Sequence, residues 1–175
     1  MMRLAIGVAL LTTAASPTPS WTLTPTGWGP AQIGMTRAQV SKALNVELEG
    51  DGFDSEGNCQ ELVGAHEAFP GLFFMFERGR LTRITATEPS VVATPRGIHV
   101  GSTHEEVRKA YGKGLKAEPH HYEAATNEFL TFPAEYLTFW LKPGRSGVRF
   151  EMDTQGKVES IHAGTSSIQY AEGCA

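Results

Sequence analysis

The sequence predicts an α+β protein made of two tandem repeats, each a short helical segment packed on an antiparallel β-sheet. Three observations predict it: a helix-start pattern that occurs twice, a hairpin pattern that follows each copy, and a composition rich in chain-breaking residues. The 19 Gly and 10 Pro make up about one residue in six of the 175, which favours many turns over a long helical bundle.

The first 15 residues have the features of a signal peptide. A positive start at Arg3 precedes an apolar run that ends in small residues up to Ala15, and this run is well under the roughly 20 residues that span a bilayer. Because no Cys follows the run, we expect no lipid anchor. The sequence therefore predicts cleavage after residue 15 and a periplasmic or secreted protein without a membrane span.

The charge balance argues against one class of partner. The net charge is −4 and no block of Lys or Arg occurs, so the electrostatic footprint of nucleic-acid or anionic-membrane binding is missing. The contents of 41% hydrophobic and 19% charged residues are those of an ordinary globular chain.

Residues 16–30 are rich in Pro and Thr, and we expect an extended segment with Trp21 and Trp28 against the sheet. Two repeat units are predicted after this segment, at residues 31–88 and 96–175, with a linker at residues 89–95. Because the linker is short and apolar in its middle, the units are expected to pack together, with their sheets side by side or continuous.

Each unit is expected to open with a short helix. Residues 32–45 align without gaps on residues 99–112. In both copies a Thr stands three residues before Gln or Glu, which is the capping box that starts a helix. Apolar residues then recur at helical spacing, and Asn45 or Gly112 is suited to end the helix.

A hairpin is expected to follow each helix. Residues 79–84 match residues 156–161, and each segment comes after a strand-like run with aromatic residues. Gly79 and Gly156 can adopt the positive φ that a tight turn requires. The two hairpin segments are ten residues further apart in the sequence than the two helix segments. The second unit therefore has ten extra residues between its helix and its hairpin, and we expect an additional strand there, at residues 136–142.

The Ile-Gly-Met-Thr-x-x-Gln-Val pattern of residues 33–40, followed by a Gly-Arg/Lys-Leu/Val-x-x-Ile hairpin, resembles the SmpA/OmlA-like units of bacterial envelope proteins. The duplicated, exported layout resembles the architecture of the β-lactamase inhibitor protein (BLIP-like) family. The resemblance implies non-covalent binding of another protein, either inhibition of an enzyme by a concave sheet or support of outer-membrane barrel assembly. The chain lacks the lipid-anchored Cys of the first group and the within-unit disulfides of the second, and no contact residue is carried over.

The predicted strand at residues 136–142 offers a candidate binding face. Alternation of apolar and polar residues places Tyr136 and Trp140 on one side of this strand and its leucines on the other. On the neighbouring strand Arg149 and Glu151 alternate with apolar residues, so we expect them on the same open face. Such mixtures are enriched at protein interfaces. Packing of Tyr136 and Trp140 under a loop or the other unit is the structural alternative.

The acidic loop at residues 47–58 is a second candidate contact region. Asp51, Phe53 and Asp54 lie among glycines there, and such a loop is suited to a basic pocket of a partner. The loop departs from the EF-hand pattern because Phe53 occupies a ligand position. A weak calcium site is the alternative to a solvated loop.

The sequence gives little indication of a catalytic or metal-binding motif. His120, His121 and Glu123 supply at most two metal ligands on one side of a strand, so a surface His pair is expected and no metal site. The serines do not lie in a nucleophile elbow or a Ser-x-x-Lys motif. We therefore predict no catalytic residues, no enzyme activity and no cofactor.

Cys59 and Cys174 are the two cysteines of the chain. In an exported protein such a pair is expected to form a disulfide, and the spacing lacks the C-x-x-C arrangement that a redox or metal site favours. We predict a structural bridge.

Together these features predict an exported, non-enzymatic protein-binding module, either an inhibitor or an envelope accessory factor, that uses the open sheet face and the acidic loop. Its partner is expected to be another exported or envelope protein. The alternative is a periplasmic small-ligand or metal-binding protein. The His120–His121 pair and the acidic loop favour this alternative.

Overall fold

The described residues form an α+β fold with two short helices and two antiparallel sheets, which confirms the α+β part of the prediction. The computed structural model describes residues 21–50, 58–122 and 134–174. The helices are α1 (Arg37–Leu44) and α2 (His104–Tyr111), with single 3-10 turns η1 (Ala65–Glu67), η2 (Gly112–Gly114) and η3 (Ser166–Gln169). None of the described helices is long and apolar enough to cross a membrane.

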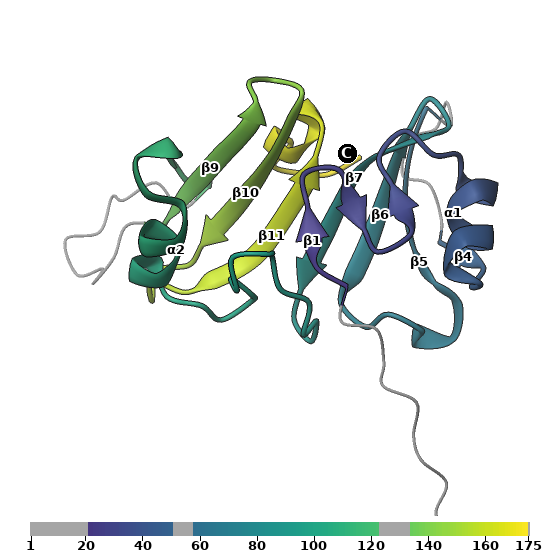
Figure 1. Cartoon of the computed structure of the whole chain (residues 1–175), viewed down its shortest axis with the longest axis horizontal. Helices are drawn as coiled ribbons and strands as arrows, with labels where there is room; N and C mark the ends of the chain where they lie inside the picture. Colours follow the sequence, from purple (N-terminus) through teal and green to yellow (C-terminus); the bar gives the residue numbers. More distant parts are fainter. Residues whose placement is uncertain (1–20, 51–57, 123–133, 175) are drawn as a thin grey trace, which may run out of the picture.

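The small sheet holds β1 (Leu23–Thr24), β2 (Gly27–Trp28) and β3 (Ala31–Gln32). The large sheet holds β4 (Leu48–Glu49), β5 (Cys59–Gly64), β6 (Leu72–Glu77), β7 (Arg80–Thr87), β8 (Leu115–Pro119), β9 (Glu135–Lys142), β10 (Ser146–Met152) and β11 (Val158–Gly164). Its strand order is β4-β5-β6-β7-β11-β10-β9-β8 (Figure 1). The strands of the two predicted units therefore form one continuous sheet.

Both helices begin at a capping box, as predicted. The Thr36 side chain accepts a hydrogen bond from the Gln39 amide, and the Gln39 side chain accepts one from the Thr36 amide at 2.9 Å. Thr103 and Glu106 make the same pair of bonds at the start of α2. Each helix buries one stripe, which is Val40 and Leu44 in α1 and Val107 and Tyr111 in α2.

Two hairpins follow the helices, as predicted. β6 pairs with β7 and β10 pairs with β11, both antiparallel. The first turn holds Arg78 and Gly79 at φ of 49° and 72°, and the second holds Gly156 at 72°. Such positive φ values match the twist of the flanking strands in a tight hairpin.

The loop before each helix is bonded to its hairpin in the same way. Gly34 N–H donates to the Leu81 carbonyl and Leu81 N–H donates to the Met35 carbonyl, both at 2.8 Å. In the other half the same two bonds, again at 2.8 Å, join residues 101–102 to Val158. These bonds fix the start of each helix against the second strand of its hairpin.

The predicted strand at residues 136–142 is present as β9, but it is not additional, because the first half has a corresponding strand. β9 pairs with β10, and β5 pairs with β6 at the corresponding place in the other half. Each half therefore contributes four strands, and the halves meet at β7 and β11. The sequence does not reveal β5 because its residues, Cys-Gln-Glu-Leu-Val-Gly, show little alternation of apolar and polar side chains.

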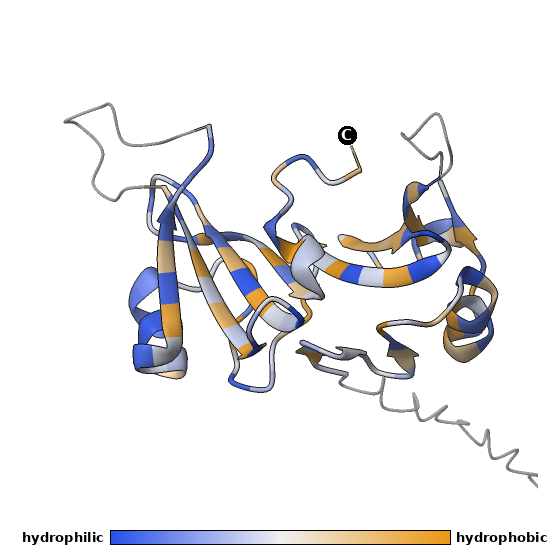
Figure 2. Ribbon diagram, turned by 90° about the horizontal axis from the view of Figure 1, so that it is seen from above, coloured by the Kyte–Doolittle hydropathy of each residue, from blue (hydrophilic) through white to orange (hydrophobic). Residues whose placement is uncertain are grey.

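Helices α1 and α2 and the small sheet cover one face of the large sheet, as the views in Figures 1 and 2 agree. The main hydrophobic core lies between these layers. Its members without exposed surface include Leu23, Val40, Phe74, Ile84, Val107, Leu137, Phe150 and Ile161. The opposite face is partly covered by η3 and the end of the chain (Figure 2).

The described part of the N-terminal segment is extended in β1 and β2, and it folds back on itself because these two strands pair antiparallel. Its two tryptophans lie against the sheet as expected: the Trp28 ring is 5.0 Å from the Trp21 ring and 4.9 Å from the Phe69 ring, centre to centre. Leu23 N–H donates to the carbonyl of Ala93 in the linker at 2.9 Å. The linker is therefore packed on the small sheet.

Truncation of the core aromatic Phe74 to alanine should lower the free energy of unfolding by about 3–5 kcal/mol, because a fully buried ring is lost and a cavity remains. Val91, which is 93% exposed, supplies the control, since Val91→Ala should change stability by less than about 0.5 kcal/mol. Urea unfolding followed by circular dichroism measures both. Equal effects of the two substitutions would contradict the core placement.

Candidate functional site

The face of the large sheet opposite the helices carries polar side chains, and we call it the polar face. The predicted alternation in β9 holds: Leu137 and Phe139 join the core, while Tyr136 and Thr138 lie on the polar face. Neighbouring strands add Arg83, Thr85, Arg149, Glu151, Ser160 and His162 to it.

One residue of β9 departs from the prediction. Leu141, expected on the core side, is 55% exposed. It lies near the end of β9, where it lines an open groove with Pro25 and Ile33.

Three side chains hold the Glu151 carboxylate at the centre of the polar face. His120 Nε2 lies 2.6 Å from Oε1, the Ser160 hydroxyl donates to Oε2 at 2.7 Å, and His162 Nε2 lies 3.3 Å from Oε2. The Nδ1 atom of His162 is 3.0 Å from the Thr85 hydroxyl. These bonds are satisfied with a neutral His162, because the Thr85 hydroxyl then donates to Nδ1 and the Nε2–H group faces Glu151.

The charges in this cluster follow from burial and hydrogen bonding. Burial alone would raise the pKa of Glu151, but the hydrogen bonds from His162, Ser160 and His120 outweigh it and hold the pKa at about 2. Burial lowers the pKa of His162 despite its bond to Glu151, and the nearby Arg83 and Arg149 lower it further. At neutral pH Glu151 is therefore a carboxylate and His162 is neutral.

The cluster differs from a catalytic triad in its connections. In a triad the carboxylate and the serine bind opposite nitrogens of the histidine. Here Ser160 Oγ, at 2.9 Å, and Glu151 both face Nε2 of His162, while Nδ1 is occupied by Thr85. Ser160 is also 7% exposed. The arrangement orients and stabilises Glu151 and does not prepare Ser160 for nucleophilic attack.

The two adjacent histidines do not form the expected surface pair. His121 is exposed, but His120 is 8% exposed and stacks on the Tyr136 ring at 4.7 Å between centres. The prediction is wrong for His120 because β8 ends at Pro119, and the chain then turns this side chain over the polar face toward Glu151.

The expected open face is largely closed at two of its predicted contact residues. Tyr136 and Arg149 are both 6% exposed, and the Arg149 guanidinium lies 3.8 Å from the centre of the Tyr136 ring. Arg149 also pairs with Glu118 at 3.3 Å. Trp140 and Glu151 are half-buried. The structure thus brings the four predicted residues to one face, but Tyr136 and Arg149 form its floor.

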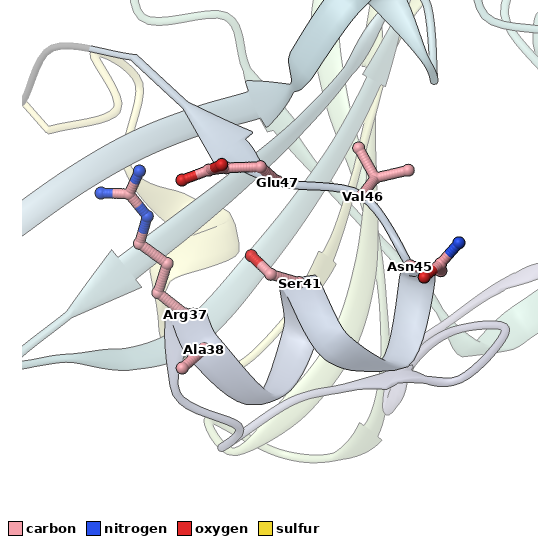
Figure 3. Close-up of a pocket in the computed structure, with 6 residues that line it drawn as sticks. All are labelled: Arg37, Ala38, Ser41, Asn45, Val46 and Glu47. Carbon is pink, nitrogen blue, oxygen red and sulfur yellow. The ribbon is translucent and has the colours of Figure 1, made fainter.

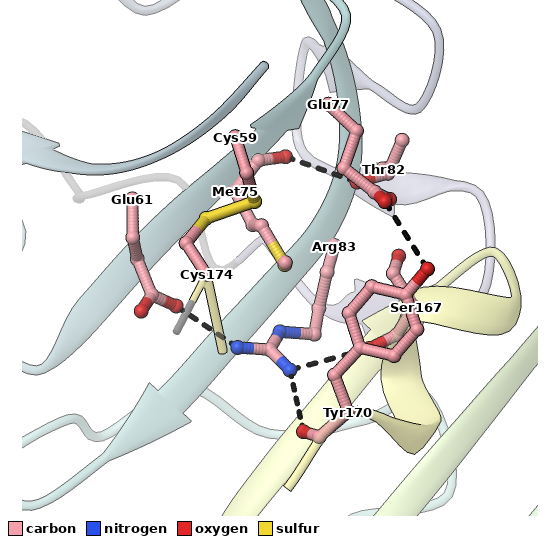
Figure 4. The surroundings of a disulfide bond; sticks show 9 residues. All are labelled: Cys59, Glu61, Met75, Glu77, Thr82, Arg83, Ser167, Tyr170 and Cys174. Carbon is pink, nitrogen blue, oxygen red and sulfur yellow. Dashed lines mark hydrogen bonds and ion pairs between the residues drawn. A yellow bond between two sulfur atoms is a disulfide. The ribbon is translucent and has the colours of Figure 1, made fainter. Parts of the chain in front are cut away.

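The predicted disulfide between Cys59 and Cys174 is present, with a Cα–Cα distance of 5.5 Å. It ties residues 165–174, which we call the C-terminal strap, to β5 (Figure 4). The bridge closes 115 residues, and loss of loop entropy in the unfolded chain on this scale is worth about 4–5 kcal/mol. A disulfide fits an oxidising compartment.

Arg83 binds the strap to the sheet. Its Nη1 atom donates to the carbonyls of Ser167 and Tyr170 at 3.2 and 3.0 Å, and its Nη2 atom pairs with Glu61 at 3.1 Å (Figure 4). The Arg83 side chain is 3% exposed. This buried cation is compensated by one carboxylate and two carbonyls, as a buried charge requires.

A pocket of about 590 Å³ lies between α1 and the segment leading to β4 (Figure 3). Arg37, Ser41 and Glu47 give it a mixed polar lining, and the Arg37 guanidinium also bonds the Leu48 carbonyl. The charges of Arg37 and Glu47 are of opposite sign, so the pocket has no strong preference for an anion or a cation.

The remaining predicted contact residues, Asp51, Phe53 and Asp54, lie outside the described residues, as does Glu123. Within the described parts of the chain, no group of three or more His, Cys, Asp or Glu side chains is arranged to hold a metal ion.

Comparisons with known protein families, with curated proteins and with solved structures find no match to this chain.

Sequence reasoning missed the partners of Glu151. The three partners are His120, Ser160 and His162, and Thr85 bonds His162 from behind. These residues come from three separate stretches of the chain, and the pairing of β7, β11 and β10 brings most of them together. One local signal existed, because Ser160 and His162 alternate with apolar residues in the Val-Glu-Ser-Ile-His-Ala sequence of β11. That signal indicates a shared face but not the carboxylate that they bind.

Stability should fall on acidification in two steps. His162 has a lowered pKa, so the unfolded chain takes up its proton first and stability is lost as the pH falls below about 6.5. Glu151 has its pKa lowered to about 2, so a further loss begins below about pH 4.5 and reaches roughly 1.4 kcal/mol at pH 3.5. Urea unfolding at pH 7.5, 5.5 and 3.5 measures both steps.

The matched variants are Glu151→Gln and, on the exposed first turn of α2, Glu105→Gln. Glu151→Gln should already be destabilised at pH 7.5 by about 1–3 kcal/mol, because an amide cannot accept all three bonds, and it should lose less on going from pH 5.5 to 3.5. Glu105→Gln should show the same dependence of stability on pH as the unsubstituted protein. A Glu151→Gln variant with the same pH profile as the unchanged chain would show that the cluster does not set the acid response.

Proposed function

We propose that this chain is an exported, non-enzymatic protein-binding module, an inhibitor or an envelope accessory factor, whose partner contacts the polar face. One observation carries the proposal: the two faces of the large sheet are unequal. Helices and the small sheet cover the apolar face, whereas the polar face combines exposed aromatic side chains with a hydrogen-bonded charged floor.

The aromatic side chains of the polar face have the composition of an interface. Tyr122 is 60% exposed, Tyr170 is 45% exposed, and Trp140 is half-buried. The Tyr122 hydroxyl bonds Glu172 and the Tyr170 hydroxyl bonds Glu77. Tyr and Trp supply large contact areas at low entropic cost, and they dominate binding energies at protein interfaces.

The floor beneath them favours binding because it is ordered in advance. Glu151 is fixed by three side chains, and Arg149 is held between Glu118 and the Tyr136 ring. A surface that is already ordered loses less conformational entropy when a partner docks.

The charges on this face indicate a partner with basic groups. Around the centre of this face the cations Arg83 and Arg149 are buried, with side-chain exposures of 3% and 8%, whereas Glu61, Glu151 and Glu118 are 24%, 22% and 47% exposed. Lys116, opposite Thr138 on the edge strand β8, is an exposed cation of the same face. Away from this edge, solvent therefore meets carboxylates first. The acidic loop with Asp51, Phe53 and Asp54 stays a second predicted contact region of the same sign.

We also propose that the two halves of the fold are copies of one repeat unit. Two features support it: the matching bonds from Leu81 and Val158 to the loops before α1 and α2, and the mirrored strand order on either side of β7 and β11. The resemblance to SmpA/OmlA-like units and to the β-lactamase inhibitor family stays a prediction, and so does the choice between inhibitor and accessory factor.

Site-directed photo-crosslinking tests the proposal. A photoreactive phenylalanine replaces Tyr122, which lies on the polar-face side, or Val91, which is 93% exposed in the linker and serves as the control. The tagged protein is irradiated with envelope and culture-supernatant fractions of its source. We expect one protein to be joined at position 122 and not at position 91, and a Trp140→Ala substitution in the same chain to reduce its yield.

Two outcomes would contradict the proposal. Equal yields from positions 122 and 91 would indicate non-specific contact. A partner joined only at position 91 would place the interface on the covered side of the sheet.

A further inference from the structure

The C-terminal strap consists of two parts that are held differently. In the first part, Ser167 and Ile168 are 0% and 1% exposed, and the Thr165 side chain caps η3. In the second part, residues 170–172 are exposed and Cys174, at 9%, is the buried residue. Packing therefore anchors the first part, whereas the second part depends on individual bonds.

The bonds of the second part are few and near the surface. Arg83 donates to the Tyr170 carbonyl at 3.0 Å, the Tyr170 hydroxyl bonds Glu77 at 3.2 Å, and the Tyr122 hydroxyl bonds Glu172. The two tyrosine bonds join exposed side chains, and such bonds compete with water. The covalent link to Cys59 is thus the main restraint on this part of the strap.

The end of the strap lies over part of the polar face. Met75 in β6 is the strand partner of both Glu61 and Arg83, so it shares their face of the sheet, and it is fully buried. A Cβ atom on Gly173 would come within 3.1 Å of Glu61 and 3.3 Å of the Arg83 guanidinium. The strap backbone therefore rests directly on the Glu61–Arg83 ion pair.

We propose that residues 170–174 are a cover that opens when the Cys59–Cys174 disulfide is reduced, exposing Met75 and the Glu61–Arg83 pair while the sheet stays folded. The reductant is a dithiol. One of its thiolates attacks a sulfur of the disulfide and displaces the other cysteine as a thiolate, and its second thiol then resolves the mixed disulfide. The dithiol loses two electrons, and Cys59 and Cys174 each end as a protonated thiol.

This inference goes beyond the proposed function and does not depend on a partner. As a consequence, the area of the polar face that solvent reaches depends on whether the bridge is closed or open. With the bridge closed, Arg83 is occupied by two carbonyls of the strap. With the bridge open, the bond to Tyr170 is lost and Arg83 can donate to an incoming backbone carbonyl.

Methionine oxidation tests the proposal on the full chain. Met75 is fully buried and Met152 is 1% exposed in the core of the other half. Met152 therefore serves as the internal control for the oxidation of Met75. The unchanged protein is reduced with dithiothreitol, alkylated with iodoacetamide and treated with dilute hydrogen peroxide, and the sulfoxide at each position is quantified by mass spectrometry. The double variant Cys59→Ser/Cys174→Ser is treated in parallel to exclude an effect of the alkyl groups.

Both opened forms should oxidise Met75 at least about tenfold faster than the disulfide-bonded protein, with Met152 unchanged, because local opening exposes one thioether and global unfolding would expose both. Protection of Met75 in both opened forms would show that the strap stays in place without the bridge. A parallel rise at Met75 and Met152 would show that the disulfide holds the whole fold. Either result overturns the proposal.

Discussion

The antiparallel pairing of β7 with β11 is the interaction on which the rest of the structure depends. Residues 83–87 pair with residues 160–164, and this seam joins two groups of four strands into one sheet. It places Thr85 beside His162 and so completes the bonds around Glu151. It also places Arg83 beneath the strap that follows β11. Neither half alone contains the whole polar face.

Much of the fold could be predicted because its signals are local. The capping boxes at Thr36 and Thr103 and the turns at Gly79 and Gly156 each depend on a few adjacent residues. The number of strands could not be predicted in the same way. β5 shows little alternation, and β8, at the sheet edge, reads Leu-Lys-Ala-Glu-Pro, which suits an unpaired edge better than a sheet interior.

The candidate site was predicted in part, for a related reason. Alternation within single strands correctly grouped Tyr136, Arg149 and Glu151 on one face. Exposure depends on what covers a face, and nothing in the strand sequences shows that His120 turns over Tyr136 or that the strap crosses Arg83. The disulfide was predictable because the two cysteines of the chain leave one pairing. Its role as a restraint on the strap emerges from the burial of the residues around it.

Native-state hydrogen exchange is the measurement that tests the central claim, that one seam makes both halves and the polar face a single cooperative unit. The amides of residues 83–87 and 160–164 should be among the slowest to exchange, and those of β6 and β10 should approach the same opening free energy as denaturant is added. Early exchange at the seam, with one half still protected while the other opens, would contradict the account and show two independently folding halves.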